Sequence, residues 1–303
     1  MDNPVPSGTY PRATDGTAVN TLPRKRGSVS NSHPDNRETA SSRLKWQYLS
    51  HWYPLITLVR RDFKVRYARS VLGISWSFLL PLLSLILYTT VFATILKVRV
   101  GHEVNRGSFI LFLLSGNLPF TAMAEGIMRG SASLTANRNL LKKVIFPAVV
   151  LPMVGVLSAT VAELIGLTLL LLYAVASGVN LSLWILLLPL LIALRVVMTL
   201  GLAWLVSILT VFFSDFGHLL GLMITGWLFV TPIFYPANTI PLSLLPLFKL
   251  NPLFHLTTAY RAVILQGSNP FPGIFPVALF AAAAALTGLW FFRKMLDRAK
   301  DFI

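Results

Sequence analysis

Residues 75–96 read SWSFLLPLLSLILYTTVFATIL, a run of 22 residues without a charged side chain. As an α-helix that rises 1.5 Å per residue, this run would be roughly 33 Å long, enough for the hydrocarbon core of a bilayer. The natural solvent for such a run is lipid. It therefore predicts a membrane-spanning helix.

The rest of the chain repeats this pattern. Of its 303 residues, 55% are hydrophobic and 12% charged, whereas soluble domains are about 25% charged. The mean hydropathy is +0.69. These values exclude an ordinary soluble domain and a disordered protein. We predict an all-α integral membrane protein with six transmembrane helices, at residues 75–96, 108–128, 148–176, 183–212, 217–235 and 272–292.

The segment before the first span divides into two parts. Residues 1–43 are rich in Pro, Ser, Thr and Asn, and we expect a disordered cytoplasmic tail. In residues 44–72, apolar side chains recur every four positions and basic ones fall largely on other faces, which predicts an amphipathic helix on the cytoplasmic membrane surface. Residues 44–303 then form the transmembrane domain.

The segment between the fifth and sixth spans is irregular. Prolines at 236, 241, 246 and 252 forbid one continuous helix, although residues 240–250 are strongly apolar. Non-helical backbone at membrane depth must be covered by protein or line a cavity. We therefore expect re-entrant or interfacial short helices on the outer side.

Basic residues set the orientation. The net charge is +15, and with the N-terminus inside, 20 of the 26 Lys and Arg residues fall on the inner side. Positive charge favours the cytoplasmic side, so both termini are predicted to be cytoplasmic. The charge lies before the first span and in short links, a pattern that favours contact with the membrane surface over nucleic-acid binding.

Several classes of active site are excluded. The sequence has no cysteine, no G-x-x-x-x-G-K-[ST] loop, no H-E-x-x-H and no G-x-S-x-G motif. Asp215 and His218 lie at the link before the fifth span, where we expect Asp215 to cap the helix. We therefore expect no enzyme, and no metal or cofactor bound by this chain.

Two ionisable residues, Glu163 and Arg195, lie inside predicted spans. Such residues cost free energy in lipid and are functional candidates. They either line a polar passage or pair with each other across adjacent helices, and the sequence leaves both readings open. Glu125 and Arg129 are four residues apart, and we expect them to pair on one helix face.

Small and aromatic residues offer weaker signals. The pairs Gly126/Gly130 and Gly217/Gly221 are spaced for close helix approach, of which a dimer face is one case. Trp76, Phe92, Phe229 and Tyr235 lie in spans or near their ends. Aromatic residues there anchor helices at the interface or stack on sugar rings, and composition does not choose between the two.

Three blocks of sequence follow one another at suitable spacing. The first runs from RDFKVRY (61–67) through SVLG (70–73) to Trp76 and Pro81. The second is NRNLLKKVIFP (137–147), followed by Leu151-Pro152. The third contains Asp215, TPIFYP (231–236), Asn251-Pro252 and Arg261. Together, over residues 44–300, they resemble the ABC-2 type permeases that export polysaccharides.

The resemblance implies a half-transporter in the bacterial inner membrane. Two copies of this chain would form a homodimer, and two copies of a separate ATP-binding subunit would hold ATP and Mg²⁺ and dock from the cytoplasm. The residues that would transmit ATP-driven motion lie in the first two blocks: Asp62, Phe63, Arg66, Tyr67, Asn137, Leu141, Lys142, Lys143, Phe146 and Pro147.

The resemblance also implies a cargo, a lipid-linked polysaccharide such as an O-antigen. Residues 238–266 would resemble the outer re-entrant gate. Candidates for the pathway or gate are Trp76, Phe92, Glu163, Arg195, Phe229, Tyr235, Asn251 and Arg261. Teichoic acid or another lipid-linked polymer is the nearest alternative. An ABC-2 drug efflux permease, a membrane-embedded glycosyltransferase or ligase, and a passive scaffold or channel are the others.

Overall fold

The structure is a computed structural model that describes residues 55–66, 70–88, 90–91, 106–141 and 147–302. Within these ranges the regular elements are helices, and no strand occurs. The described part is therefore all-α, as the sequence predicts. The predicted tail at residues 1–43 lies outside the described residues.

Four helical stretches are long and apolar enough to cross a membrane: 109–136, 150–176, 183–212 and 271–301. They belong to α3 (Arg106–Ala136), α5 (Val150–Ala176), the 3₁₀ turn η3 (Leu183–Leu187) with α6 (Leu188–Phe212), and α10 (Phe271–Asp301). They confirm the second, third, fourth and sixth predicted spans.

The other two predicted spans correspond to shorter helices. After the 3₁₀ turn η1 (Gly73–Ser75), α2 (Trp76–Tyr88) covers the first part of the predicted span, whose residues 92–96 lie outside the described ranges. The fifth predicted span is α7 (Phe216–Val230), which has 15 residues. It ends before the predicted Tyr235 because Thr231 is extended, the conformation that a following proline favours.

The start of α7 corrects one expectation. Asp215 stands at the N-cap position, but its side chain makes no capping hydrogen bond. Its backbone is in the right-handed helical region, φ −78° and ψ −9°, whereas a side-chain cap requires an extended residue there. The predicted capping role of Asp215 is wrong.

Two helices run further than their apolar cores. The predicted second span stops at residue 128, but α3 continues to Ala136, where Asn137 donates a side-chain hydrogen bond to the Ser133 carbonyl and α4 (Arg138–Leu141) follows. The last helix, α10, extends to Asp301 with basic residues in its last turn, which suits the negative end of a helix dipole.

The helix α3 is the most deeply buried of the four long helices and packs between α5 and α6. Small residues set these contacts. A Cβ atom added at Gly130 would lie 2.6 Å from Cβ of Ala203, and one added at Gly126 would lie 2.8 Å from Cγ2 of Thr199. The Gly126/Gly130 pair therefore serves packing of α3 against α6 within the chain.

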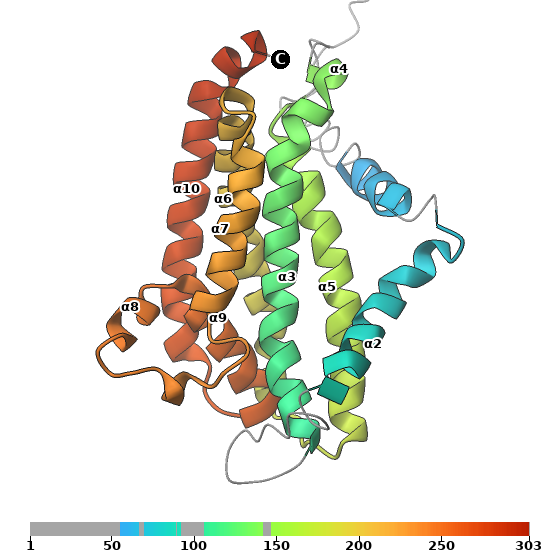
Figure 1. The fold of residues 1–303 in the computed structure, drawn as a ribbon, viewed down its shortest axis with the longest axis vertical. Helices are drawn as coiled ribbons and strands as arrows, with labels where there is room; N and C mark the ends of the chain where they lie inside the picture. Colours follow the sequence, from blue (N-terminus) through green and yellow to red (C-terminus); the bar gives the residue numbers. More distant parts are fainter. Residues whose placement is uncertain (1–54, 67–69, 89, 92–105, 142–146, 303) are drawn as a thin grey trace, which may run out of the picture. The chain divides into compact units, whose positions relative to one another are not determined.

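The irregular segment between the fifth and sixth predicted spans consists of short helices, as its prolines predict. It contains the 3₁₀ turn η4 (Ala237–Thr239), α8 (Leu245–Lys249), α9 (Pro252–Arg261) and the π-helical turn η5 (Ala262–Gln266). In Figure 1, α8 and α9 lie at the opposite end of the bundle from α4 and the end of α10. The predicted outer and inner segments thus lie at opposite ends.

The segment before α2 is helical over residues 55–66. Leu55 and Phe63 are buried, whereas Ile56 and Val65 are exposed. A helix is therefore present where the sequence predicts the surface helix, and its placement at a membrane surface stays a prediction.

Candidate coupling site and buried polar clusters

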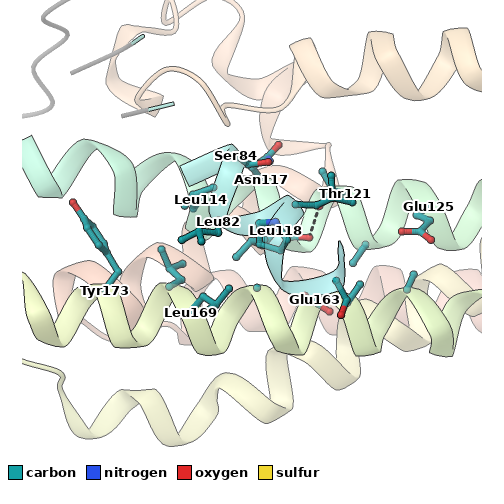
Figure 2. Close-up of a pocket in the computed structure, with 18 of the residues that line it drawn as sticks. Leu82, Ser84, Leu114, Asn117, Leu118, Thr121, Glu125, Glu163, Leu169 and Tyr173 are labelled. Carbon is teal, nitrogen blue, oxygen red and sulfur yellow. Dashed lines mark hydrogen bonds between the residues drawn. The ribbon is translucent and has the colours of Figure 1, made fainter. Parts of the chain in front are cut away.

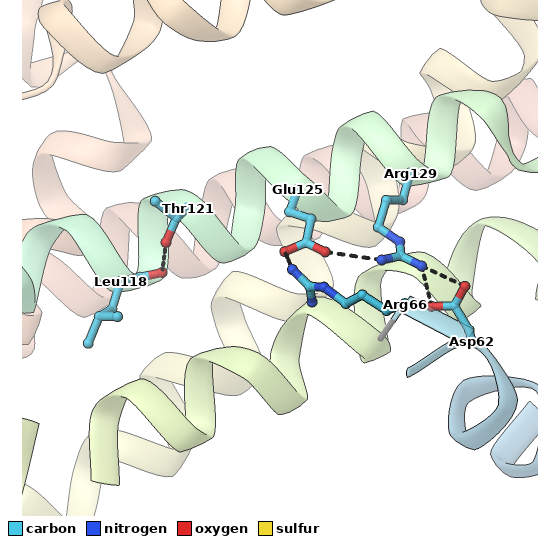
Figure 3. Close-up of polar contacts among 6 residues, drawn as sticks. All are labelled: Asp62, Arg66, Leu118, Thr121, Glu125 and Arg129. Carbon is cyan, nitrogen blue, oxygen red and sulfur yellow. Dashed lines mark hydrogen bonds and ion pairs between the residues drawn. The ribbon is translucent and has the colours of Figure 1, made fainter. Parts of the chain in front are cut away.

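An ion-pair cluster joins the helix over residues 55–66 to α3 (Figure 3). Nη2 of Arg129 donates to both carboxylate oxygens of Asp62, at 2.5 and 2.6 Å. Nη1 of Arg129 donates to Glu125 at 3.2 Å, and Nη2 of Arg66 donates to Glu125 at 2.7 Å. We call these four residues the coupling cluster.

The cluster arises from matched helical spacing. Asp62 and Arg66 are four residues apart on one helix, and Glu125 and Arg129 are four apart on the other, so opposite charges meet twice. The predicted Glu125–Arg129 pair is confirmed, at 3.2 Å. The partners across the two helices were missed, although both helices carry an acidic residue followed four positions later by an arginine, a pattern that lets the two pairs cross.

A hollow of about 660 Å³ lies beside this cluster. It is lined by the helix over residues 55–66, the end of α3, the start of α4 and the start of α5, and its walls include Arg61, Asp62, Arg129, Asn137, Asn139 and Leu140. The structure therefore brings the first and second predicted coupling segments to one place. Because both predicted coupling segments line this hollow, it is the candidate docking or transmission site among the described residues.

Three of the remaining predicted coupling residues, Phe63, Leu141 and Pro147, lie in or beside the helices of this region. Phe63 is buried, and Leu141 is half-buried at the end of α4. The carbonyl of Pro147 accepts the Val150 N–H at 3.0 Å and so starts α5. Tyr67, Lys142, Lys143 and Phe146 lie outside the described residues.

Glu163 and Arg195 form an ion pair between α5 and α6, with both side chains fully buried. Nη2 of Arg195 also donates to Thr160 Oγ1 at 2.9 Å, and the Tyr260 hydroxyl donates to Glu163 Oε1 at 3.1 Å. The sequence left open whether these two residues line a polar passage or pair with each other, and the structure shows that they pair. Tyr260, from α9, is a third member that sequence reasoning missed.

Arg261 is a buried cation held by backbone carbonyls. Its Nε donates to the Phe112 carbonyl at 3.2 Å, and Nη2 donates to the Ile233 carbonyl at 2.9 Å. Its guanidinium carbon lies 3.5 Å from the Phe112 ring centroid, a cation–π contact. Burial lowers the pKa of Arg261 to about 9, so the side chain stays protonated at neutral pH. Arg261 therefore joins α9 to α3 and to the turn that follows α7.

Asn251 performs a similar task at the start of α9. Its Oδ1 accepts from Trp227 Nε1 at 2.8 Å and caps α9 by accepting from the Leu253 N–H at 3.0 Å. Its Nδ2 donates to Thr231 Oγ1 at 3.0 Å. Asn251 is thus the N-cap that ties α9 to α7, a role for which the Asn-Pro pair at a helix start is typical.

The other pathway candidates lie apart from these clusters. Trp76 Nε1 donates to Ser70 Oγ at 2.6 Å. The Tyr235 hydroxyl donates to the Phe229 carbonyl at 2.8 Å, and the Phe229 side chain is exposed. Phe92 lies outside the described residues. The structure does not bring the seven described pathway candidates to one cleft.

A different cleft opens between α2, α3 and α5 (Figure 2). Its volume is about 340 Å³, and of the predicted pathway residues it contains Glu163. Its other residues with polar side-chain groups are Arg66, Ser77, Ser84, Asn117, Thr121, Glu125 and Tyr173. We call this cavity the α2 cleft. Among the described residues, no group of three or more His, Cys, Asp or Glu residues is placed to hold a metal ion.

Comparison with known proteins agrees with this architecture. Residues 53–265 match the ABC-2 type transporter family. The chain is 30% identical over 251 residues to the O-antigen export system permease protein RfbA of Myxococcus xanthus, covering 82% of this chain and 92% of that protein. It is 26% identical over 250 residues to the protein of the same name from Klebsiella pneumoniae, covering 82% and 94%.

The chain therefore belongs to the ABC-2 type transporter family. It is a multi-pass membrane permease, and the family implies an ABC transporter with a partner ATP-binding subunit. The resemblance identified from the three sequence blocks is confirmed.

Proposed function

We propose that this chain is the membrane permease of an ATP-driven exporter that moves a lipid-linked O-antigen or related envelope glycan across the bacterial inner membrane. The observation that carries the proposal is its likeness to O-antigen export permeases over nearly their whole length. Hydrolysis of ATP, with Mg²⁺, takes place in a separate subunit present in two copies.

The proposed topology has six spans, of which residues 75–96 and 217–235 include the first and fifth. α2 and α7 support this count because both are apolar helices. Both termini lie in the cytoplasm, and α8 and α9 form a re-entrant outer segment. Their location opposite to α4 agrees with this arrangement (Figure 1).

The hollow beside the coupling cluster is the proposed docking site for the ATP-binding subunit. Motion of that subunit reaches the helix over residues 55–66 and the link at 137–147, and the coupling cluster passes it to α3. Salt bridges suit this task because they hold two rigid helices in one geometry. The two charge pairs span the helices directly.

Two copies of the chain form the pathway. The candidate gate residues Trp76, Phe92, Phe229 and Tyr235 contribute aromatic surface to it. Glu163, Arg195, Asn251 and Arg261 take a supporting role in the proposal, because their polar atoms are engaged in contacts between helices. They position the spans and the outer helix α9.

Deletion of the gene tests this function. The prediction is loss of glycan from the cell surface and accumulation of the lipid-linked polymer on the cytoplasmic side, with both defects reversed by the wild-type gene. Chemical analysis of the accumulated material identifies the polymer, and a teichoic acid there would replace O-antigen as the cargo. Unchanged surface glycan with increased drug sensitivity would contradict the proposal.

A further inference from the structure

The α2 cleft has a largely apolar lining in which a few polar side chains are set. Asn117, Thr121 and Glu125 follow one another at four-residue spacing, so they share one face of α3. Across from them, Ser77 and Ser84 are seven residues apart on α2 and share one face of that helix. Figure 2 shows the α3 residues and Ser84 around the cavity.

Exposed apolar side chains of α2 lie both inside and outside the cleft lining. Phe78, Leu83, Ile86 and Leu87 are exposed and lie outside the cleft lining. These side chains suit contact with lipid tails. Leu80 and Leu82 are also exposed but line the cleft beside Ser77 and Ser84, so the two serines supply the polar groups of a wall that is otherwise apolar.

Two polar groups of the cleft make no hydrogen bond to the part of the chain that the structure describes. Among the described residues, neither the Asn117 side-chain amide nor the Ser84 hydroxyl has a hydrogen-bond partner, and Asn117 is 9% exposed. A polar group at membrane depth without a partner is costly. A hydrocarbon occupant would leave both groups unsatisfied, so the occupant must supply donors and acceptors.

The two carboxylates that line the cleft, Glu163 and Glu125, are already paired and are not placed to bind an ion. Both oxygens of Glu163 are engaged, one with Arg195 and the other with Tyr260. Glu125 is paired with Arg66 and Arg129. The groups proposed to bind an occupant are neutral. The Asn117 amide and the Ser84 hydroxyl can both donate and accept, whereas the Thr121 hydroxyl already donates to the Leu118 carbonyl and can accept.

We propose that the α2 cleft binds a hydroxyl-rich chain, in this exporter a short stretch of the glycan, through Ser84, Asn117 and Thr121. The volume, about 340 Å³, is near the lower end for ligand pockets and suits a short stretch. Neutral amide and hydroxyl groups bond to successive sugar hydroxyls with similar energies, which lets a polymer move through. The identification of the ligand as the glycan rests on the proposed function. The inference that water reaches the cleft is independent of that function.

The absence of cysteine makes the first test direct. Asn117→Cys introduces a single thiol into the cleft, and Leu164→Cys, exposed on α5 and outside the lining, is the control. In membrane vesicles, a charged methanethiosulfonate reagent should modify Asn117→Cys at least tenfold faster, because the reactive thiolate requires water. Equal rates would overturn the proposal and indicate a lipid-filled cleft.

The second test asks what the cleft binds. Modification of Asn117→Cys should be several-fold slower in cells that synthesise the polymer than in cells where its synthesis is blocked. Thr121→Val should lower export several-fold at unchanged protein level, whereas Thr168→Val should not. These threonines match because each donates to a carbonyl of the preceding turn, but Thr168 is outside the cleft.

The outcomes separate this proposal from the proposed function. If Asn117→Cys reacts rapidly but the polymer has no effect on its rate, and Thr121→Val exports normally, the cleft does not bind the glycan. Export by the wild-type chain would still stand in that case. If deletion of the whole gene leaves surface glycan unchanged, the proposed function fails, and the glycan as occupant of the cleft fails with it.

Discussion

Substitution of Glu163 and Arg195 by glutamine, singly and together, measures the energetics of the buried ion pair. The structure places both charges at zero side-chain exposure, with Thr160 and Tyr260 as their neutral partners. Each single substitution leaves the other charge buried without a counter-charge. The double substitution leaves two neutral amides in the same space.

The expected magnitudes follow from burial. Removing one member of a buried pair costs about 3–5 kcal/mol, since the remaining charge is uncompensated. In the double variant the amides can bond to each other, to Thr160 and to Tyr260, so the loss is about 1–2 kcal/mol from weaker hydrogen bonds. The double variant should therefore be more stable than either single variant by at least about 1 kcal/mol.

Unfolding in mixed micelles, followed by tryptophan fluorescence, measures these differences. Asp297→Asn is a control, because its pair with Lys300 is exposed and worth roughly 0–1 kcal/mol. A double variant whose loss equals the sum of the two single losses would refute the pairing argument, since independent sites add.

Three further predictions concern other contacts. Arg129→Gln should lower glycan exported per ATP hydrolysed while the complex still hydrolyses ATP, because it breaks both links of Arg129 in the coupling cluster; an unchanged ratio would contradict its transmission role. Gly130→Ala should cost about 1–3 kcal/mol by overpacking against Ala203, whereas Gly226→Ala, with nothing within 4 Å, should be tolerated; the yield of monodisperse protein checks both, and equal yields would count against close α3–α6 packing. Asn251→Ala should lower the free energy of unfolding by about 1–2 kcal/mol because α9 loses its cap, and an unchanged thermal melting temperature would contradict this role.

The sequence predicts features that repeat along one helix. Apolar runs give four of the spans, and four-residue spacing gives the Glu125–Arg129 pair. Hydropathy locates the apolar part of a helix and not its end. For this reason the predicted second span stops at residue 128, whereas α3 continues to Ala136. The end at Asn137 depends on a local hydrogen bond that hydropathy does not register.

Contacts between helices were harder to predict. Tyr260 reaches Glu163 from 97 residues away, and Arg261 reaches the Phe112 carbonyl from 149 residues away. No spacing along the chain indicates either contact, because both depend on where α9 packs. Arg261 illustrates the consequence: the family resemblance makes it a pathway or gate candidate, whereas its neighbours in the fold are backbone carbonyls and an aromatic ring that it holds together.

The role of Asp215 shows a limit of another kind. An Asp before an apolar helix is typical of an N-cap, but backbone conformation decides whether its side chain reaches the free N–H groups. The tight link between α6 and α7 holds this residue in the helical region, so the cap does not form. The preference of Asp for N-cap positions does not reveal how a short link between two helices fixes its backbone conformation.

The most direct measurement is purification of the tagged chain from native membranes in mild detergent, with mass spectrometry of the proteins bound to it. A permease driven by a separate ATP-binding subunit predicts a second polypeptide, with a G-x-x-x-x-G-K-[ST] loop, in near-equal amount. Recovery of the chain alone across several detergents would contradict that account and indicate a membrane protein that works without a partner ATPase.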